Sequence, residues 1–565
     1  MKRFVVDIEA NGLLELTIKK DEAVVEADRI WCMVVKDIDT DQVWKFTEPD
    51  MEEGVTLLRT ADLVIGHSII AYDIPLLERI HGPIDVEKYD TLIVARLMYP
   101  DRRNHPFGGN SLKAWGKYLN CHKIEYDLGF EEWNPEMLVY CEQDVEVTCR
   151  VFRRQEGFVQ SNQRSVDLEH LVSNIIARQV DNGIAFDIEA AHQLEQDLLM
   201  EKVTIEDDMS EIFPPIVEER WSEKTGKRLK DNTIHFNPGS RKQIAKRLHD
   251  KYNWVPPLTD KGNPKVDSAV LKELRYPEAI TLVRYFDVIK MLSQLTDWIT
   301  RSVYSRDGRI HGSVNTQGTV TGRMTANQPN LQQVSGDKRT RALFGPREGW
   351  AQVGIDASGL EARLLANRMA QWDDGAYGMA VLHGDIHTVN QQAAGLATRH
   401  EAKTFFYALI YGAGNAKIGK IIHRTAQIGG ETKQRFLDEM PAMKKVIEKC
   451  KFQVAKKGTI TLLDDREVPC RAKHAALNVQ IQGDGAIIMK VAQSIFANRI
   501  DNQCPDKVAF MATVHDEWQL ECDPEWADYI GQLGVASIQE AGKVLGCTVP
   551  MDGNYRIGKN WAECH

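Results

Sequence analysis

The sequence lacks the marks of several classes of protein. Its ten cysteines are scattered over 565 residues and form no Cys-x-x-Cys pair, so neither a disulfide framework nor a zinc site is expected. No apolar run is long enough to cross a bilayer, and the N-terminus carries charges too early for a signal peptide. Repeats and low-complexity tracts are absent as well. We expect a globular, cytoplasmic protein with reduced thiols and no membrane contact.

The sequence also has no excess of basic over acidic residues. The formal net charge is −11, from 81 acidic and 70 basic residues, whereas nucleic-acid-binding domains usually carry a basic surface. A nucleic-acid partner would therefore require lysine and arginine to gather in a cleft, with the acids on outer faces. The length of the chain indicates more than one domain.

An acidic residue stands where a predicted strand turns into a predicted helix. Val353 and Ile355 alternate up to Asp356, and Leu360 and Leu364 then open a helical pattern. A carboxylate at such a junction is poorly placed for a core and well placed for a metal ion.

A second acidic residue lies at the tip of a predicted β-hairpin. Residues 508–514 form an apolar run, and Trp518, Leu520 and Cys522 alternate on the return strand. This arrangement leaves Asp516 at the tip. Two aspartates at the tips of two strands can hold a pair of divalent cations roughly 3.5–4 Å apart, as in-line phosphoryl displacement requires.

A stripe of cations and rings lies between these two segments. Thr398 and Glu401 form a predicted capping box at the start of a helix. Four residues then recur every four positions along one face of that helix: Arg399, Lys403, Tyr407 and Tyr411. A lone lysine on a helix is usually just solvated, but this stripe suits a triphosphate at one end and a base and sugar at the other.

The start of the chain carries another acidic pair. Asp7 and Glu9 are two apart on a predicted strand, so both project from the same face. Like charges this close are costly unless a cation lies between them. The alternative interpretation is a solvated edge strand with two surface acids.

Two later segments favour a site at this strand. Asp73 begins a predicted helix, and Tyr140 and Asp144, four apart on another predicted helix, share a face. His67, in the apolar strand at 63–68, is interpreted as a core histidine and is given no chemical role.

The segment from residue 156 to 310 is predicted to be mostly helical, with Ser240 as an N-cap. Lysine and arginine are frequent between residues 224 and 247. Each of them alone is best explained as part of a solvated helix face. As a group they suit a thumb that grips duplex phosphates without reading sequence.

The acidic and basic segments of the second half resemble, in order, motifs A, B and C of the family A DNA polymerases. The matching residues are Asp356, Ser358, Glu361 and Arg363 for motif A, Arg399, Lys403, Tyr407, Tyr411 and Gly412 for motif B, and His515, Asp516 and Glu517 for motif C. Segments 237–241, 259–262, 311–315 and 560–565 resemble the replicative polymerases of short-tailed bacteriophages in particular. The resemblance covers nearly the whole chain and implies DNA replication in a host cytoplasm.

The resemblance also implies residue roles. The implied ligands of two Mg²⁺ are Asp356, Asp516 and the backbone carbonyl of Ala357, with Glu517 as a secondary acid. The implied nucleotide-binding residues are Arg399, Lys403, Tyr407, His387, Glu361 and Tyr411. Lys403 would also give a proton to the leaving pyrophosphate, and Glu361 would exclude a ribose 2′-OH. The implied DNA-binding residues are Arg323, Gln482 and His515, although Gln482 also fits an ordinary polar residue near a helix N-terminus.

The N-terminal acids resemble those of the DnaQ-like 3′→5′ exonucleases, which have an RNase H-type fold. The implied ligands of two further Mg²⁺ are Asp7, Glu9, Asp73 and Asp144. Tyr140 would help to position the attacking water.

The implied architecture is a multidomain α/β and α+β protein, in which an RNase H-like exonuclease domain precedes a right-hand polymerase. The expected segments are the exonuclease domain (1–155), a helical connector and thumb (156–310), the first part of the palm (311–368), the fingers (369–474) and the second part of the palm (475–565).

The implied partners are primer–template DNA and dNTPs. A replisome helicase, a primase and a single-strand-binding protein are further candidates, and we expect a monomer. Thioredoxin is not expected, because only about 20 residues separate Pro215 from Asn237, too few for an added subdomain. A 5′-nuclease domain ahead of the exonuclease is not expected either.

Three alternatives remain open. A single-subunit RNA polymerase would also pair two aspartates, although Glu361 and the tyrosines of motif B argue against it. A nuclease whose C-terminal half only binds DNA would explain residues 1–155 alone. A non-enzymatic scaffold would show no magnesium dependence.

Overall fold

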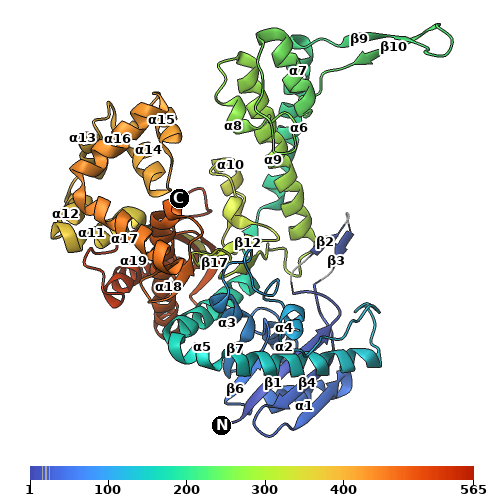
Figure 1. Cartoon of the computed structure of the whole chain (residues 1–565). Coiled ribbons are helices and arrows are strands. Elements are labelled where there is room, and N and C mark those ends of the chain that lie inside the picture. Colours follow the sequence, from blue (N-terminus) through green and yellow to red (C-terminus); the bar gives the residue numbers. More distant parts are fainter. Residues whose placement is uncertain (15–16, 20–21, 25) are drawn as a thin grey trace. The chain divides into compact units, whose positions relative to one another are not determined.

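A computed structural model of the chain describes residues 1–14, 17–19, 22–24 and 26–565. These residues form two compact units, one of Met1–Ala185 with Tyr304–His565 and the other of Phe186–Val303. In Figure 1 the chain is coloured from blue at the N-terminus to red at the C-terminus. Every predicted site residue belongs to the first unit.

The first unit begins with a five-stranded sheet in the order β5-β4-β1-β6-β7. The strands are β1 (Arg3–Ala10), β4 (Ile30–Asp37), β5 (Val43–Thr47), β6 (Leu63–Gly66) and β7 (Glu87–Asp90). β1 pairs antiparallel with β4 and parallel with β6. It is therefore an interior strand, and the interpretation of Asp7 and Glu9 as surface acids of an edge strand is wrong.

A long helix covers the face of this sheet that carries the two acids. Val5 lies in a core cluster with Cys141 of α5 (Pro135–Asn182). Because alternate side chains of a strand share a face, Asp7 and Glu9 project to the same side as Val5, toward α5. The other helices of this region are α1 (Met51–Leu58), α2 (Asp73–His81), α3 (Thr91–Met98) and α4 (Leu112–Tyr118). Asp73 begins α2, and Tyr140 and Asp144 lie on α5, as predicted.

The segment α5 extends past residue 155 and consists of two helices joined by a kink at Asn162, where φ is −135° and ψ is 23°. It ends at Gly183, whose φ of 63° favours glycine. Along its course α5 contacts β1 and β4, and then α18 (Ala476–Gln503) and β17 (Val508–Val514). The two helical parts of α5 thus connect the N-terminal sheet to the C-terminal part of the first unit.

A second sheet has the strand order β17-β18-β14-β19, with all neighbours antiparallel. Its other strands are β18 (Glu517–Cys522), β14 (Ala351–Ala357) and β19 (Gly553–Gly558). Helix α19 (Ala527–Val544) packs on β14 and β19, and α18 and α11 (Leu360–Asp373) contribute residues to the same core. Ile355 and Trp518 are fully buried in this core. The predicted strand-to-helix junction after Asp356 and the predicted hairpin around Asp516 are both confirmed.

The segment between β14 and β17 is helical. Its elements are α12 (Ala376–His383), α13 (Ile386–Ala394), α14 (Arg399–Ile410), α15 (Asn415–Ile421), α16 (Ala426–Glu439), α17 (Pro441–Lys457) and the small hairpin of β15 (Thr459–Thr461) and β16 (Glu467–Pro469). The predicted capping box of Thr398 and Glu401 is present at the start of α14.

The second unit consists of long helices and a two-stranded hairpin. Its elements are α6 (Ile188–Ile212), β9 (Ile216–Trp221), β10 (Arg228–Ile234), α7 (Arg241–Tyr252), α8 (Ser268–Leu271) and most of α9 (Pro277–Tyr304). Ser240 caps α7 as predicted. The shorter elements of the chain are β2 (Thr17–Lys19), β3 (Glu22–Val24), β8 (Ala185–Phe186), β11 (Ser313–Asn315), β12 (Thr325–Asn327), α10 (Lys338–Arg341) and β13 (Phe344–Gly345). Within the described ranges, no helix combines the length and the apolar character needed to cross a membrane.

Candidate functional site

The β17-β18-β14-β19 sheet brings the two predicted aspartates to the same end of neighbouring strands. The N–H of Ala357 donates a hydrogen bond of 3.0 Å to the carbonyl oxygen of Asp516, and Asp356 stands opposite Glu517 in the β14–β18 register. His515 turns the chain in the left-handed region with a φ of 57°. The backbone itself therefore holds the two candidate metal ligands side by side.

The electrostatics of this pair fit a divalent cation. Burial, together with the nearby charges of Asp516 and Glu517, raises the pKa of the Asp356 carboxyl to about 7. A cation between the carboxylates would remove that repulsion. The side-chain ligand atoms are carboxylate oxygens, and hard cations such as Mg²⁺ prefer oxygen ligands of this kind.

Glu517 is held by groups from outside the hairpin. Its Oε1 accepts hydrogen bonds from Trp561 Nε1 at 2.9 Å and from the side-chain amide of Gln519. His565 Nδ1 lies 2.9 Å from Oε2. Both carboxylate oxygens are therefore engaged by protein donors, which favours a supporting role for this acid beside the two aspartates.

The start of α14 gathers the predicted phosphate ligands. Arg399 donates its Nε to Asp385 at 2.5 Å, and Lys403 is exposed one turn further along the helix. Burial and the positive charges of Arg399 and Lys403 lower the pKa of His387. An anion placed here would meet the positive charges of Arg399 and Lys403, and it would compete with Asp385 for Arg399.

At the C-terminal end of α14, the predicted sugar and base contacts lie beside Glu361, at the start of α11. The Tyr411 hydroxyl donates to Glu361 Oε1 at 2.8 Å, and Arg323 Nη2 lies 3.5 Å from the same oxygen. Burial, with the charges of Glu361 and Asp516 nearby, raises the pKa of Tyr407. The structure therefore brings these residues together around one acid.

The predicted DNA contacts are only partly brought together. A small cavity beside β17 is lined by Arg323, His515 and Asp516, and also by Lys490 of α18. Gln482 lies near the start of α18, half-buried, and it is not among the lining residues.

The N-terminal sheet brings the predicted exonuclease acids into one buried cluster. The N–H of Ile8 donates to Asp73 Oδ1 at 3.3 Å, which ties α2 to β1. Burial raises the pKa of Glu9 to about 8, and burial and the surrounding acids raise that of Asp7 well above its usual range. Asp144 Oδ1 is buried and has no hydrogen-bond partner among the described residues. This all-oxygen set of mutually repelling acids fits divalent cations of the Mg²⁺ type.

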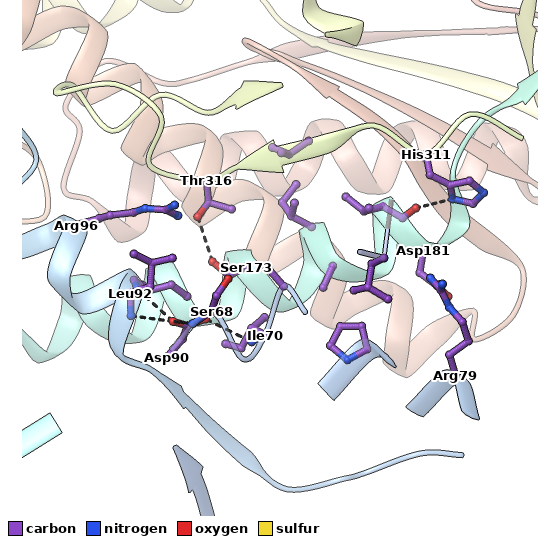
Figure 2. A pocket seen from close by; sticks show the side chains of 18 of the residues that line it. Ser68, Ile70, Arg79, Asp90, Leu92, Arg96, Ser173, Asp181, His311 and Thr316 are labelled. Carbon is purple, nitrogen blue, oxygen red and sulfur yellow. Dashed lines mark hydrogen bonds and ion pairs between the residues drawn. The ribbon is translucent and has the colours of Figure 1, made fainter. Parts of the chain in front are cut away.

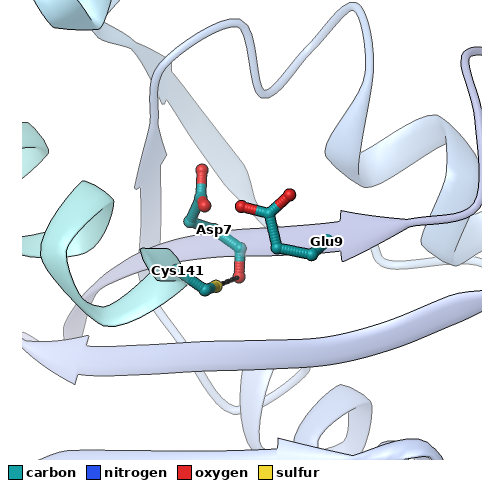
Figure 3. Close-up of side chains that lie close together, drawn as sticks. All are labelled: Asp7, Glu9 and Cys141. Carbon is teal, nitrogen blue, oxygen red and sulfur yellow. Dashed lines mark hydrogen bonds between the residues drawn. The ribbon is translucent and has the colours of Figure 1, made fainter. Parts of the chain in front are cut away.

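A cysteine lies beside two of these acids. Figure 3 shows Asp7, Glu9 and Cys141 close together. Their possible ligand atoms all lie within 4.8 Å of one another. The Cys141 thiol donates to the carbonyl oxygen of Asp7 at 3.2 Å, and burial raises its pKa well above the usual value. A protonated thiol is a poor ligand for a hard cation, so Cys141 packs the site and does not complete its ligand set.

The sequence analysis missed a lysine in this site. Lys123, in the loop after α4, donates a hydrogen bond to Asp144, and its ammonium group lies 4.4 Å from the centre of the Tyr140 ring. Burial lowers the pKa of Lys123, but the nearby charge of Asp144 raises it by more, so the net shift is upward. Lys123 therefore brings a fixed positive charge to the acids. No periodicity or spacing in the sequence signals this, because the contact depends on how the loop folds onto α5.

Removal of divalent metal is expected to make stability fall as pH rises from roughly 5 to 8. Glu9 and Asp73 have folded-state pKa values of about 8 and about 7, so in this window the folded protein binds more protons than the unfolded chain. A carboxyl with a raised pKa stabilises the fold while protonated, and this contribution is lost as pH passes through the folded pKa. Thermal unfolding in EDTA across this range measures the slope, and Mg²⁺ should restore stability at the alkaline end.

Two variants check the origin of this slope. Glu9→Gln combined with Asp73→Asn removes the titrating groups and should flatten it. Lys123→Met removes the compensating cation and should steepen it. An unchanged slope in the first variant would show that the acids of this cluster are not its source.

A different cavity, drawn in Figure 2, is lined by none of the predicted site residues. It lies between α3, α5 and the segment that follows β11. The Ser173 and Thr316 hydroxyls share a hydrogen bond of 3.1 Å there, and Arg79 pairs with Asp181 at 3.3 Å. These four polar side chains thus pair with one another, and we assign the cavity no ligand.

A solved structure resembles the whole chain in its fold. A solved structure of the POL domain of Pol1 from M. smegmatis, in complex with DNA primer-template and dNTP, superimposes with a TM-score of 0.80 at 18% identity. The match covers 100% of this chain and 96% of that one. At this identity the likeness defines the fold, which is that of a polymerase.

The sequence relationships define the family. The profile of DNA polymerase family A matches residues 216–563. The DNA-directed DNA polymerases of Escherichia phage T7 and Enterobacteria phage T3 are each 30% identical, over 99% of this chain and 100% of theirs. DNA polymerase I of Aquifex aeolicus is 25% identical over 95% of this chain and 94% of its own length. The chain belongs to DNA polymerase family A.

Proposed function

We propose that this chain is a template-directed DNA polymerase with a 3′→5′ proofreading exonuclease, and that it replicates phage-type DNA by two-metal nucleotidyl transfer. The observation that carries the proposal is the pair of separate carboxylate clusters, one on each sheet of the first unit. We assign the exonuclease domain to residues 1–155, the connector and thumb to 156–310, the palm to 311–368 and 475–565, and the fingers to 369–474.

In the polymerase site, Asp356, Asp516 and the carbonyl of Ala357 would hold two Mg²⁺, which when bound lower the pKa of the primer 3′-OH and neutralise the triphosphate. Arg399 binds the phosphates at the start of α14. Lys403 lies next along the same face and donates a proton to the leaving pyrophosphate.

The incoming nucleotide lies along the rest of α14. His387 presents a ring N–H to the phosphates. Glu361, fixed by the Tyr411 hydroxyl at 2.8 Å, lies under the sugar and excludes a ribose 2′-OH. Tyr407 packs against the sugar and base. A hydrogen-bonded carboxylate cannot easily move aside, which makes the exclusion of ribonucleotides strict.

In the exonuclease site, four acids would hold two Mg²⁺, which when bound activate a water and stabilise the charge on the scissile phosphate. These acids are Asp7, Glu9, Asp73 and Asp144. Tyr140 orients the attacking water, and Lys123 holds Asp144 in place. Mispaired primer ends fray, and the single strand that results is the substrate of this site.

The primer end is held by donors in the minor groove. We assign this role to Arg323 and Gln482, with His515 steadying the primer terminus. Minor-groove N3 and O2 acceptors are present in every base pair, so donors there test the shape of a pair and not its sequence.

The proposed substrates are primer–template DNA and dNTPs, and the proposed state is a monomer. A helicase, a primase and a single-strand-binding protein are candidate partners. Thioredoxin is not among them, because the segment where an added subdomain would be needed forms only the hairpin of β9 and β10. The alignment with the phage T7 polymerase runs over 721 positions against 565 residues here, so that relative contains segments which this chain lacks.

Primer extension with Mg²⁺, using dNTPs or NTPs, tests the proposal against its alternatives. We expect extension with dNTPs only. Incorporation of NTPs would indicate an RNA polymerase. Digestion without any incorporation would indicate a nuclease with a DNA-binding C-terminal half, and a chain without Mg²⁺-dependent activity would indicate a scaffold.

Dideoxynucleotides are expected to be good substrates of the unaltered chain. The hydroxyl of Tyr407 can occupy the space that a missing 3′-OH leaves. Tyr407→Phe should therefore lower the incorporation of ddTTP relative to dTTP by about 10²-fold or more, because the hole is then left unfilled. Competitive primer extension gives the ratio. Strong discrimination against ddTTP by the unaltered chain would contradict this role.

A further inference from the structure

A buried cluster of charged side chains joins α5 to the polymerase half of the first unit. Lys490 of α18 donates to both carboxylate oxygens of Glu169 on α5, at 2.7 and 2.8 Å. Arg466, just before β16, donates to Glu169 at 2.6 Å and to Asp464 at 2.7 Å. Ser165, one turn before Glu169, donates to Asp464 at 2.9 Å. None of these five residues is more than 6% exposed.

Stability alone does not account for such a cluster. Each buried ion loses hydration at a cost of several kcal/mol, and well-packed apolar residues often stabilise an interface equally well. Two anions and two cations neutralise each other here, so burial is tolerated. Charge-assisted hydrogen bonds fix distances and directions more tightly than apolar contacts do. The cluster is therefore suited to setting the position of the groups next to it.

The groups next to it belong to the DNA side of the polymerase site. A Cβ atom built on Gly322 would lie 3.8 Å from Nη1 of Arg466, so the guanidinium lies directly behind the loop that carries Arg323. Lys490 lines the same cavity as Arg323 and Asp516. The two cations that Glu169 binds thus flank the predicted primer contact from two elements.

A second buried contact attaches α5 to the strand that leads to Asp516. The Thr513 hydroxyl on β17 donates to Gln179 of α5 at 2.7 Å, and Gln493 of α18 donates to Thr513 at 3.2 Å. Gln179 lies about three helical turns beyond Glu169. Helix α5 is therefore fixed at two points to the elements that surround the cavity.

We propose that Glu169 is a positioning residue of the polymerase site. It holds Arg466 and Lys490 in place, and this keeps the Gly322–Arg323 loop at a fixed distance from α18. The primer end is bound in the cavity between this loop and α18. This inference rests on the proposed polymerase function. It gives a polymerase role to α5, the helix that also carries Tyr140 and Asp144 of the exonuclease cluster.

Glu169→Gln in the full chain tests the role. The amide keeps the size of the side chain but leaves two buried cations facing a neutral group. We expect the KM for primer–template DNA to rise about tenfold or more while kcat for a correct dNTP changes less than about threefold. Digestion of single-stranded DNA should stay at the level of the unaltered chain. Glu156→Gln, an exposed glutamate on the same helix, is the matched control and should change neither constant.

A double variant separates positioning from stability. Glu169→Gln with Lys490→Met removes the unpaired cation, so the unfolding temperature should return toward that of the unaltered protein. The KM should nevertheless stay raised. If the KM returns together with the unfolding temperature, or if Glu169→Gln never raises it, Glu169 contributes only stability and the inference is overturned. Absence of extension by the unaltered chain would instead refute the proposed function.

Discussion

Asp356→Ala is expected to abolish primer extension while digestion of single-stranded DNA continues. The substitution removes a carboxylate whose pKa burial and neighbouring acids raise to about 7, and with it one side of the proposed metal site. Metal stabilisation of a phosphoryl-transfer transition state is worth several kcal/mol, so we expect a loss of about 10³-fold or more in the rate of nucleotide insertion. Single-nucleotide insertion and single-strand digestion, both with Mg²⁺ under the same conditions, measure the two activities.

Two further variants make this result specific. Asp516→Ala should give the same pattern, because the Ala357–Asp516 backbone hydrogen bond of 3.0 Å keeps both aspartates at one end of the sheet. Glu348→Ala removes an exposed acid of the same part of the chain and should leave both activities intact. Loss of both activities in Asp356→Ala would argue against two separate sites.

The elements around the polymerase site could be predicted because their signals are local. Alternation of apolar residues placed the strands on both sides of Asp516, and the change of period after Asp356 placed the strand-to-helix junction. Thr398 and Glu401 are three residues apart, so the capping box is visible in the sequence itself. In each case the physical interaction involves residues close together along the chain.

The contacts that fix these elements in space could not be predicted. Glu169 meets Lys490 and Arg466 across about 300 residues of sequence, at separations of 321 and 297. Lys123 reaches Asp144 from an irregular loop with no periodicity of its own. Such contacts depend on tertiary packing, which a single sequence without related sequences does not encode in a readable pattern.

For the same reason, the sequence could not show whether β1 is an edge strand or an interior strand. Asp7 and Glu9 fit either position, and only the pairing of β1 with its neighbouring strands decides between them. The partner on one side, β6, begins at Leu63, far along the chain. An interior position places both acids on the face that α5 covers, where Glu9 is buried and Asp7 is partly buried. This makes a cation the simplest way to balance the cluster, and it turns an ambiguous pair into a candidate site.

Asp7→Ala is expected to remove proofreading and leave polymerisation unchanged. The carboxylate belongs to a cluster whose pKa values burial raises, to about 8 for Glu9 and about 7 for Asp73, so its loss takes away a ligand that no water can easily replace. We expect single-strand digestion to fall about 10³-fold or more. Asp127→Ala, an exposed acid of the same domain, should have no effect.

A primer with a mismatched 3′ end joins both activities in one measurement. The unaltered chain should first trim the mismatch and then extend, so that the product carries the corrected base. Asp7→Ala should extend slowly from the mispair and keep the wrong base, while it extends a matched primer at the normal rate. Since the two carboxylate clusters lie on different sheets, only a defect confined to the N-terminal cluster can produce this combination. Correction of the mismatch by Asp7→Ala would place the trimming activity elsewhere in the chain.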